Sequence, residues 1–374
     1  MKQITKAVVC TFISIFAFWL VQQILETNEA PVFETGTYTD YYYSCLTETE
    51  KQAYTAVREQ IYSFPENIRV PELDSAALEN VLEALICDNP CMFMFDSCSL
   101  ITAGSATYFE PQYTMTATEY EAQNSAANKK ADSIIAAMPD TNEYEKQLFL
   151  HDSVVSMCIY SDTDSASEDD IYGVFSIGRA KCSGYAKAYK LLLDKAGIPC
   201  ALVSGYAEDY DGNGAQHMWV ATQTEGIWSY TDITWDDPIT ENGESICRHV
   251  YFCMSENMLS RTHSDYGFDF ECPDSGLYYY KAKNIYYNDY NNEILGAVSR
   301  NIAAAESADS SEVELMFADL FLLNQAEKSL FTNEDIYTVL NEAAAINPSI
   351  ITDRIRYHID YDINLITLYF ETED

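Results

Sequence analysis

Apolar residues recur at helical spacing along several long segments of the chain, so that one face of each segment is hydrophobic. This pattern predicts helices at 48–62, 75–87, 119–138, 142–160 and 182–197. Capping residues support the bounds, because Thr118 is suited to begin the helix at 119–138 and Pro139 to end it. The segment 88–90, Asp-Asn-Pro, ends the helix at 75–87.

Shorter apolar runs between turn residues predict strands at 92–95, 113–117, 200–206, 217–222 and 227–233. After residue 283 we expect a Tyr/Asn-rich strand, helices near 313–324 and 333–345, and a strand at 365–370. The mixture predicts an α+β protein of more than one domain. We divide it into 1–30, a mainly helical N-terminal region at 31–140, a core domain at 141–282 and a small C-terminal α/β extension at 283–374.

The first thirty residues have the pattern of an export signal or a membrane anchor. Lys2 and Lys6 precede an uncharged run from Ala7 to Val21, which is about as long as the apolar part of a secretory signal. No clear cleavage site follows, so a removed signal peptide and an uncleaved anchor both stay open, with a buried helix of a cytosolic protein as the weaker alternative. We therefore expect an extracytoplasmic protein, secreted or anchored in the cell membrane.

The chain is strongly acidic, with 59 Asp and Glu against 21 Lys and Arg and a net charge of −38. Such a chain repels phosphate backbones, which excludes nucleic acid as a partner and a polybasic surface for anionic lipid. Any contact with a membrane would pass through the N-terminal segment alone. Hydrophobic residues at 48% provide enough apolar material for a folded core, so global disorder is also excluded.

Eleven cysteines suggest disulfides in an exported protein. Cys87, Cys91 and Cys98 are near enough in the sequence to form one region cross-linked by disulfides, and a second such region is conceivable around 247–272. If one cysteine is a nucleophile, an odd number remains, and we expect some buried thiols and few disulfides. No Cys-x-x-Cys or Cys/His zinc spacing is present, so the sequence predicts neither a metal nor a cofactor.

Cys182 stands where the predicted helix 182–197 begins, and Gly197 ends that helix. Helix N-terminal N–H groups favour a thiolate at this position. Five cations and one acid fall within residues 179–195, an island of positive charge in an acidic chain. Most lone cysteines before a helix are structural, so Cys182 indicates a catalytic thiol only in combination with other residues.

The strands at 217–222 and 227–233 form a predicted hairpin that carries His217 and Asp232. A four-residue loop at 223–226, or a two-residue loop at Thr224-Glu225, places the two residues directly opposite each other on one face. If the two-residue loop is moved by one position, the two residues become diagonal neighbours on the same face. A three-residue loop would place them on opposite faces of the sheet. With Cys182 on a helix packed against the sheet, the set forms a Cys–His–Asp triad.

The same segment resembles the transglutaminase-like domain of bacterial proteins, over about 145–265. The motifs that carry the resemblance are Lys181–Ala186, Gly197–Cys200, Gly205, His217–Trp219, Trp228 and Asp232–Pro238. The pairs 151–152 and 251–252, with His263, are similar to those of its secreted Firmicutes-type members in the cytokinesis-protein-like branch. Val220 departs from the family, which usually has Asn there, and this puts one secondary hydrogen bond in doubt.

The resemblance implies a papain-like core with Cys182 as nucleophile, His217 as base and Asp232 as the residue that orients the histidine. Four further residues, Gly184, Tyr185, Trp219 and Trp235, are expected to support them. The chemistry implied is a thioester at Cys182 on a peptide or protein amide bond, followed by hydrolysis or by transfer to an amine. A cell-wall peptide or protein is the substrate suggested by location. A non-catalytic surface protein that keeps the fold is the competing hypothesis.

Several other features have a plainer explanation. The segment 209–214 resembles a calcium loop but is favoured as a hairpin turn, and 161–170 is favoured as a solvated loop. His151 and His263 are expected in structural roles rather than against the substrate. The Tyr clusters at 41–43 and 278–280 are expected in half-buried strands rather than in a sugar-binding surface.

Overall fold

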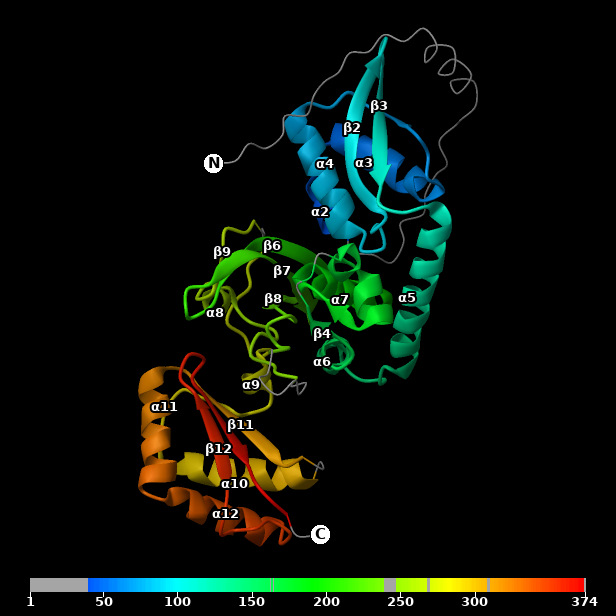
Figure 1. The fold of residues 1–374 in the computed structure, drawn as a ribbon. Coiled ribbons are helices and arrows are strands. Elements are labelled where there is room, and N and C mark those ends of the chain that lie inside the picture. Colours follow the sequence, from blue (N-terminus) through cyan, green and yellow to red (C-terminus); the bar gives the residue numbers. More distant parts are fainter. Residues whose placement is uncertain are drawn as a thin grey trace. The chain divides into compact units, whose positions relative to one another are not determined.

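Helices and strands of the chain fall into two units in the computed structural model, which describes residues 40–372 except 162, 164, 239–246, 268–269 and 308–309 (Figure 1). Residues up to 208 together with 214–273 form the first unit, and 209–213 with 274–374 form the second. The predicted signal or anchor at 1–30 lies outside the described residues. Within the described part, no helix combines the length and the apolar character needed to span a bilayer.

The centre of the first unit is helix α7 (Cys182–Ala196), packed on a four-stranded sheet of order β8-β7-β6-β9. The strands are β6 (Cys200–Glu208), β7 (Gly214–Thr224), β8 (Ile227–Thr231) and β9 (His263–Ser264), and every neighbouring pair is antiparallel. Tyr185 and Tyr189 of α7 are fully buried in one cluster with Leu202 of β6 and Val220 of β7. The predicted α+β core, a helix on an antiparallel sheet, is confirmed.

Two long helices, α5 (Ala117–Ala137) and α6 (Glu143–Val155), contact α7. Thr116 caps α5 instead of the predicted Thr118, because its hydroxyl accepts from the Glu119 N–H while the Glu119 carboxylate accepts from the Thr116 N–H. Helix α6 ends five residues earlier than predicted. The reason is that β4 (Ile159–Tyr160) pairs in parallel with β5 (Arg179–Ala180), and a strand cannot continue the helix.

The region before α5 has a hydrophobic cluster of its own. Its elements are α2 (Tyr41–Cys45), α3 (Glu48–Gln60), β1 (Ile68–Val70), α4 (Ser75–Asp88), β2 (Phe95–Ala103) and β3 (Ala106–Tyr113). The strands form an antiparallel sheet of order β1-β3-β2. Strands predicted at 92–95 and 113–117 are displaced, because 92–94 lies in a turn, β2 has no buried residue to mark a core-facing side, and β3 ends at Tyr113.

Short segments join these parts of the first unit. They are the 3₁₀ turns Ile61–Ser63 and Ala166–Asp169, the π-turn Gly173–Ile177 and helix α8 (Glu256–Leu259). The tyrosines at 41–43 lie in α2, and Tyr279 and Tyr280 lie in α9 (Tyr279–Ala282) of the second unit. The prediction of strands at both Tyr clusters was therefore wrong; periodicity cannot be measured over three residues.

The second unit is an α/β sheet of order β10-β11-β13-β12 with three longer helices in addition to the short α9. Its elements are β10 (Tyr286–Tyr287), α10 (Asn292–Ser307), β11 (Glu312–Phe317), α11 (Leu320–Glu327), the π-turn Lys328–Thr332, α12 (Asp335–Ile346), β12 (Arg356–Asp360) and β13 (Leu365–Tyr369). The helix predicted near 313–324 is a strand followed by a helix. Val313, Leu315 and Phe317 alternate into the core, and Asp319 caps α11 by accepting from the Leu322 N–H.

None of the ten cysteines that the structure describes is in a disulfide with another. Cys87, Cys200 and Cys253 are buried thiols, the first two within the hydrophobic core around α7 and the third in hydrogen-bonding contact with Gln147. The two suggested cross-linked regions are thus not formed, because apolar packing rather than cross-linking holds these segments. The expected buried thiols are present.

Candidate active site

Cys182 is the first residue of α7, as the sequence predicts, and it is partly exposed. Gly184 allows this first turn to pack closely on the preceding segment. A Cβ atom at Gly184 would lie 2.6 Å from the Glu168 carbonyl oxygen and 2.8 Å from the Ala180 Cβ. Any side chain larger than hydrogen would therefore push the start of α7, and Cys182 with it, away from that segment.

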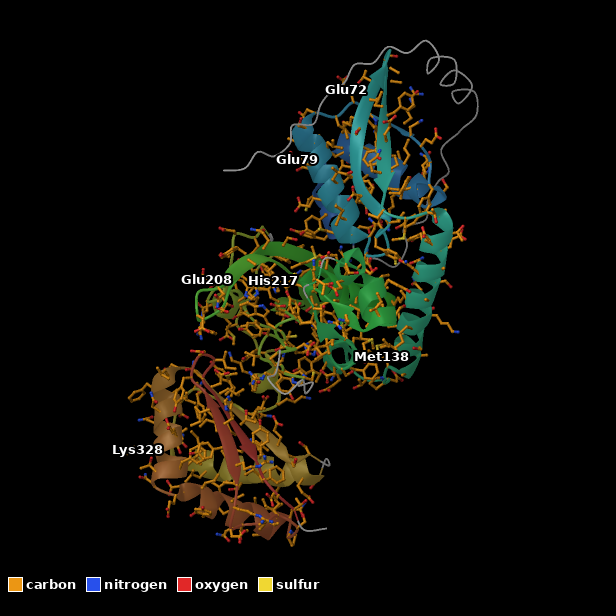
Figure 2. The ribbon with its side chains drawn as sticks, in the orientation of Figure 1. Glu72, Glu79, Met138, Glu208, His217 and Lys328 are labelled. Atoms are coloured by element: carbon orange, nitrogen blue, oxygen red, sulfur yellow. The ribbon has the colours of Figure 1, made fainter. Side chains whose placement is uncertain are left out.

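His217 of β7 lies against Asp232, with 2.7 Å between His217 Nε2 and Asp232 Oδ2. Figure 2 shows His217 on the green part of the ribbon that carries the central sheet. The β7–β8 register pairs Val220 with Thr231, and the loop is the two-residue turn Glu225-Gly226, whose φ angles of 53° and 82° suit a tight hairpin. Direct opposition of His217 and Asp232 was thus wrong, and the diagonal arrangement is observed.

The contact with Asp232 controls the charge of the His217 ring. Burial by itself lowers the pKa of His217. The negative charge of Asp232 and its hydrogen bond to the ring outweigh this effect, and a hydrogen bond with Cys182 adds to them. The pKa of His217 therefore rises to about 10. Since Nε2 is engaged by Asp232, Nδ1 is the ring atom left for the Cys182 sulfur.

Asp232 is completely buried, and its carboxylate accepts several hydrogen bonds. His263 Nε2 lies 3.1 Å from Oδ2, the same oxygen that contacts His217, and the Thr234 N–H donates to Oδ1 at 3.1 Å. Burial raises the pKa of this carboxyl, but the His217 charge and the hydrogen bonds from both histidines hold the pKa well below its usual range. Asp232 is therefore ionised at neutral pH.

His263 is the residue of this site that sequence reasoning undervalued. It was expected in a structural role, yet it bonds directly to Asp232, and its Nδ1 lies 2.9 Å from Thr262 Oγ1. Its position depends on the pairing of β9 with β6, where Ala207 faces His263. No local sequence pattern predicts that two strands more than fifty residues apart will pair in this way.

Aromatic side chains enclose the two histidines. Trp219 is fully buried, nearly parallel to the His217 ring at 6.1 Å between centroids and edge-on to His263 at 4.7 Å. Trp235 lies 5.8 Å from the His217 ring and 4.9 Å from that of His263. These rings shield the His217–Asp232 contact from water, which strengthens its electrostatics.

Tyr185 is fully buried in the hydrophobic core around α7. Its hydroxyl donates a hydrogen bond to Asp237 Oδ2, and both residues are buried. This bond joins α7 to the segment after Asp232. Among the supporting residues predicted, Trp219 and Trp235 thus contact the histidine, whereas Gly184 and Tyr185 position the helix.

The island of positive charge around Cys182 is largely neutralised. Lys181 lies 3.6 Å from Asp169, Lys190 3.0 Å from Asp194 and Lys195 2.8 Å from Asp132. Asp194 belongs to the same segment, whereas Asp169 and Asp132 come from outside it and oppose cations that the linear sequence leaves without a nearby acid. The His217 ring hydrogen-bonds Cys182, and Lys187, which is in none of these ion pairs, also interacts with that thiol electrostatically.

The two loops that drew attention in the sequence are internally hydrogen-bonded. Asp209 accepts from the Asp211 and Asn213 backbone N–H groups at 3.0 and 2.8 Å, which is the geometry of an Asx-type turn between β6 and β7. In the loop 161–170, Glu168 accepts from the Thr163 hydroxyl at 2.8 Å. The turn expected at 209–214 is thus confirmed. The expectation of a solvated loop at 161–170 was wrong, because Glu168 and Asp170 are buried and the segment includes the 3₁₀ turn Ala166–Asp169.

Comparison with known protein families decides what kind of core this is. Residues 130–233, which include Cys182, His217 and Asp232, match the transglutaminase-like superfamily. The chain contains a transglutaminase-like domain. The papain-like arrangement of α7 on its sheet agrees with that match.

Solved structures similar to the chain are distant. A TGase is 18% identical over 46% of this chain and 50% of its own, with a TM-score of 0.28. A candidate cysteine protease from Cytophaga hutchinsonii is 16% identical, covering 38% of this chain and 42% of its own, with a TM-score of 0.27. A candidate protease from Parabacteroides distasonis is 14% identical, covering 41% of this chain and 34% of its own, with a TM-score of 0.21. The chain thus spans half or less of their lengths. No curated protein matches the sequence.

Proposed function

We propose that the protein is an extracytoplasmic thiol enzyme that acts on peptide or protein amide bonds, with Cys182, His217 and Asp232 as its catalytic triad. The observation that carries the proposal is the 2.7 Å contact between His217 Nε2 and Asp232 Oδ2, which leaves Nδ1 for the sulfur at the start of α7. We further infer that the chain belongs to the secreted, cytokinesis-protein-like branch of the superfamily.

In the proposed reaction, the Cys182 sulfur attacks the carbonyl carbon while His217 holds the thiol proton. The developing oxyanion is stabilised by N–H groups at the N-terminus of α7, beginning with that of Cys182. His217 then gives its proton to the departing amine, the C–N bond breaks and a thioester remains on Cys182. Water or a second amine attacks the thioester, which releases an acid or a new amide.

Asp232 keeps the His217 ring oriented through this cycle. Its charge, held in a dry aromatic enclosure, favours the imidazolium that forms when the thiol proton moves to the ring. A peptide or protein of the cell wall is the substrate class that we propose. The N-terminal segment would keep the enzyme outside the cytoplasm, beside that substrate.

The test is the rate of alkylation of Cys182 against pH, measured on the full chain and assigned to single cysteines by mass spectrometry of its peptides. Cys45 is an exposed thiol of the same molecule and is the internal reference. We expect Cys182 to react faster than Cys45 below pH 7, and His217→Ala to remove the difference. His358→Ala, at an exposed histidine of the second unit, is the matched control and should change nothing.

Equal reactivity of Cys182 and Cys45 at every pH, unaffected by His217→Ala, would overturn the proposal. The competing hypothesis, a surface interaction protein that keeps the fold without turnover, would then hold. A positive result leads to screening with peptides and amine acceptors, which separates hydrolysis from transfer.

A further inference from the structure

Four side chains of metal-ligand type converge in the first unit, outside the proposed triad. They are His151 and Asp152, at the C-terminal half of α6, and Cys247 and His249. One possible ligand atom from each residue lies within 4.8 Å of all the others. Ninety-five residues separate Asp152 from Cys247, so no spacing rule finds the group in the sequence.

The distances within the group are close to those around a tetrahedral ion. Asp152 Oδ1 lies 2.8 Å from His249 Nε2, 3.0 Å from His151 Nδ1 and 3.5 Å from Cys247 Sγ. Cys247 Sγ and His249 Nε2 are 3.9 Å apart. Around tetrahedral zinc, with its usual bond lengths, neighbouring ligand atoms lie about 3.3–3.6 Å apart. These four distances lie within about half an ångström of that range. The remaining pairs lie within 4.8 Å, so a modest rearrangement of the side chains would bring all four ligand atoms to one ion.

A second observation points to a metal, and it comes from the far side of the His151 ring. His151 Nε2 lies 3.2 Å from Oδ2 of Asp236, a carboxylate that is itself fully buried. The other oxygen of Asp236 accepts from the Tyr251 N–H at 3.0 Å, which fixes the carboxylate. An Nε2–H donated to Asp236 fixes the ring with Nδ1 towards the cluster, where it faces Asp152 Oδ1, and an ion that replaced the Nδ1 proton would bind that nitrogen. Metal-binding histidines usually have such a carboxylate behind them.

Exposure is graded across the cluster. The His151 side chain is completely buried, His249 is 12% exposed and Asp152 is 45% exposed. Cys247 is exposed as well. An ion would thus enter from the side of Asp152 and Cys247 and come to rest against the buried ring.

We propose that His151, Asp152, Cys247 and His249 bind a divalent transition-metal ion, with zinc as the best match. Two imidazoles, one thiolate and one carboxylate are the borderline ligands that zinc prefers, and four protein ligands describe a closed, structural site. The ion would tie α6 to the segment of 247–249. This site does not depend on the proposed function, because it shares no residue with the triad.

The test is binding of Zn²⁺ to the full chain after removal of metal with a chelator, by calorimetry and by thermal unfolding. We expect one ion per chain and a higher Tm with zinc. Co²⁺ should give the visible absorption of a tetrahedral site together with a thiolate-to-cobalt charge-transfer band. Asp236→Asn should weaken zinc binding about tenfold or more, but its cobalt complex should keep the same type of absorption spectrum, because Asp236 is not itself a ligand.

Variants locate the ion. Cys247→Ser should abolish the charge-transfer band, and Cys247→Ser and His249→Ala should each weaken zinc binding at least about tenfold. Both positions are partly or wholly exposed, so these variants are expected to fold, which circular dichroism checks. Cys45→Ser and Cys182→Ser are the matched controls and should bind as the wild type does. Absence of stoichiometric binding, or loss of binding in Cys182→Ser instead of Cys247→Ser, would overturn the proposal.

Discussion

His263 Nε2 donates to Asp232 Oδ2 across 3.1 Å, so the carboxylate of the proposed triad is held by two histidines rather than one. Both rings reach the same oxygen, and both are covered by Trp219. A buried carboxylate with this many donors costs less to keep ionised than one with a single partner.

Replacement of His263 tests this second contact. His263→Ala should lower the free energy of unfolding by about 2 kcal/mol, because it removes a hydrogen bond to a buried charged group. His263→Gln, which keeps an N–H donor, should recover part of the loss. Urea unfolding at pH 7 measures both, and equal stability of all three proteins would contradict a stabilising role for this bond.

The His217–Asp232 contact predicts a pH dependence of stability. The pKa of His217 is raised from 6.5 to about 10 in the folded state, so the folded protein holds one more proton than the unfolded chain between these values. The stabilisation is complete below pH 6.5 and is lost as the pH rises through 10. The difference in unfolding free energy between wild type and His217→Ala should therefore shrink steadily over this range. His358→Ala should show no such trend.

Close packing at the start of α7 predicts a steric effect. Gly184→Ala places a Cβ atom 2.6 Å from the Glu168 carbonyl oxygen, so the backbone must shift at a cost of about 1–3 kcal/mol. Gly267→Ala is the matched control, because nothing lies within 4 Å of its added Cβ. Urea unfolding of the two variants should separate them clearly. We also expect slower alkylation of Cys182 in Gly184→Ala, because the same shift displaces the thiol.

The hairpin turn between β7 and β8 offers a stabilising change. Glu225 and Gly226 both have positive φ, and Asn-Gly suits that turn better than Glu-Gly. Glu225→Asn should raise the free energy of unfolding by about 0.5 kcal/mol, and Gly226→Ala should lower it by about 1 kcal/mol. Thermal unfolding measures both, and a fall in Tm for Glu225→Asn would contradict the assigned turn.

Local patterns in the sequence were sufficient for the elements that carry the site. The helix that begins at Cys182 and ends at Gly197 is present, and so are the strands that carry His217 and lead to Asp232. Helical spacing, alternation and capping depend on neighbouring residues alone, so a single sequence contains them. They fail where an element is short or has no buried residue, as the Tyr clusters and β2 show.

The register of the hairpin is an intermediate case. Moving the two-residue loop by one position keeps His217 and Asp232 on the same face, because side chains alternate with a period of two. The sequence therefore predicted a shared face, and only the turn geometry at Glu225-Gly226 decided that the two residues are diagonal.

The remaining relationships were decided by the tertiary structure. His263 reaches Asp232 because β9 joins the sheet beside β6, and Cys247 and His249 reach His151 and Asp152 across 95 or more residues. Such encounters depend on how whole elements pack, for which the residues between them hold no local signal. The sequence by itself thus determined the helix and strands that bear the triad, whereas the second histidine on Asp232 and the four-residue cluster exist only once those elements have packed.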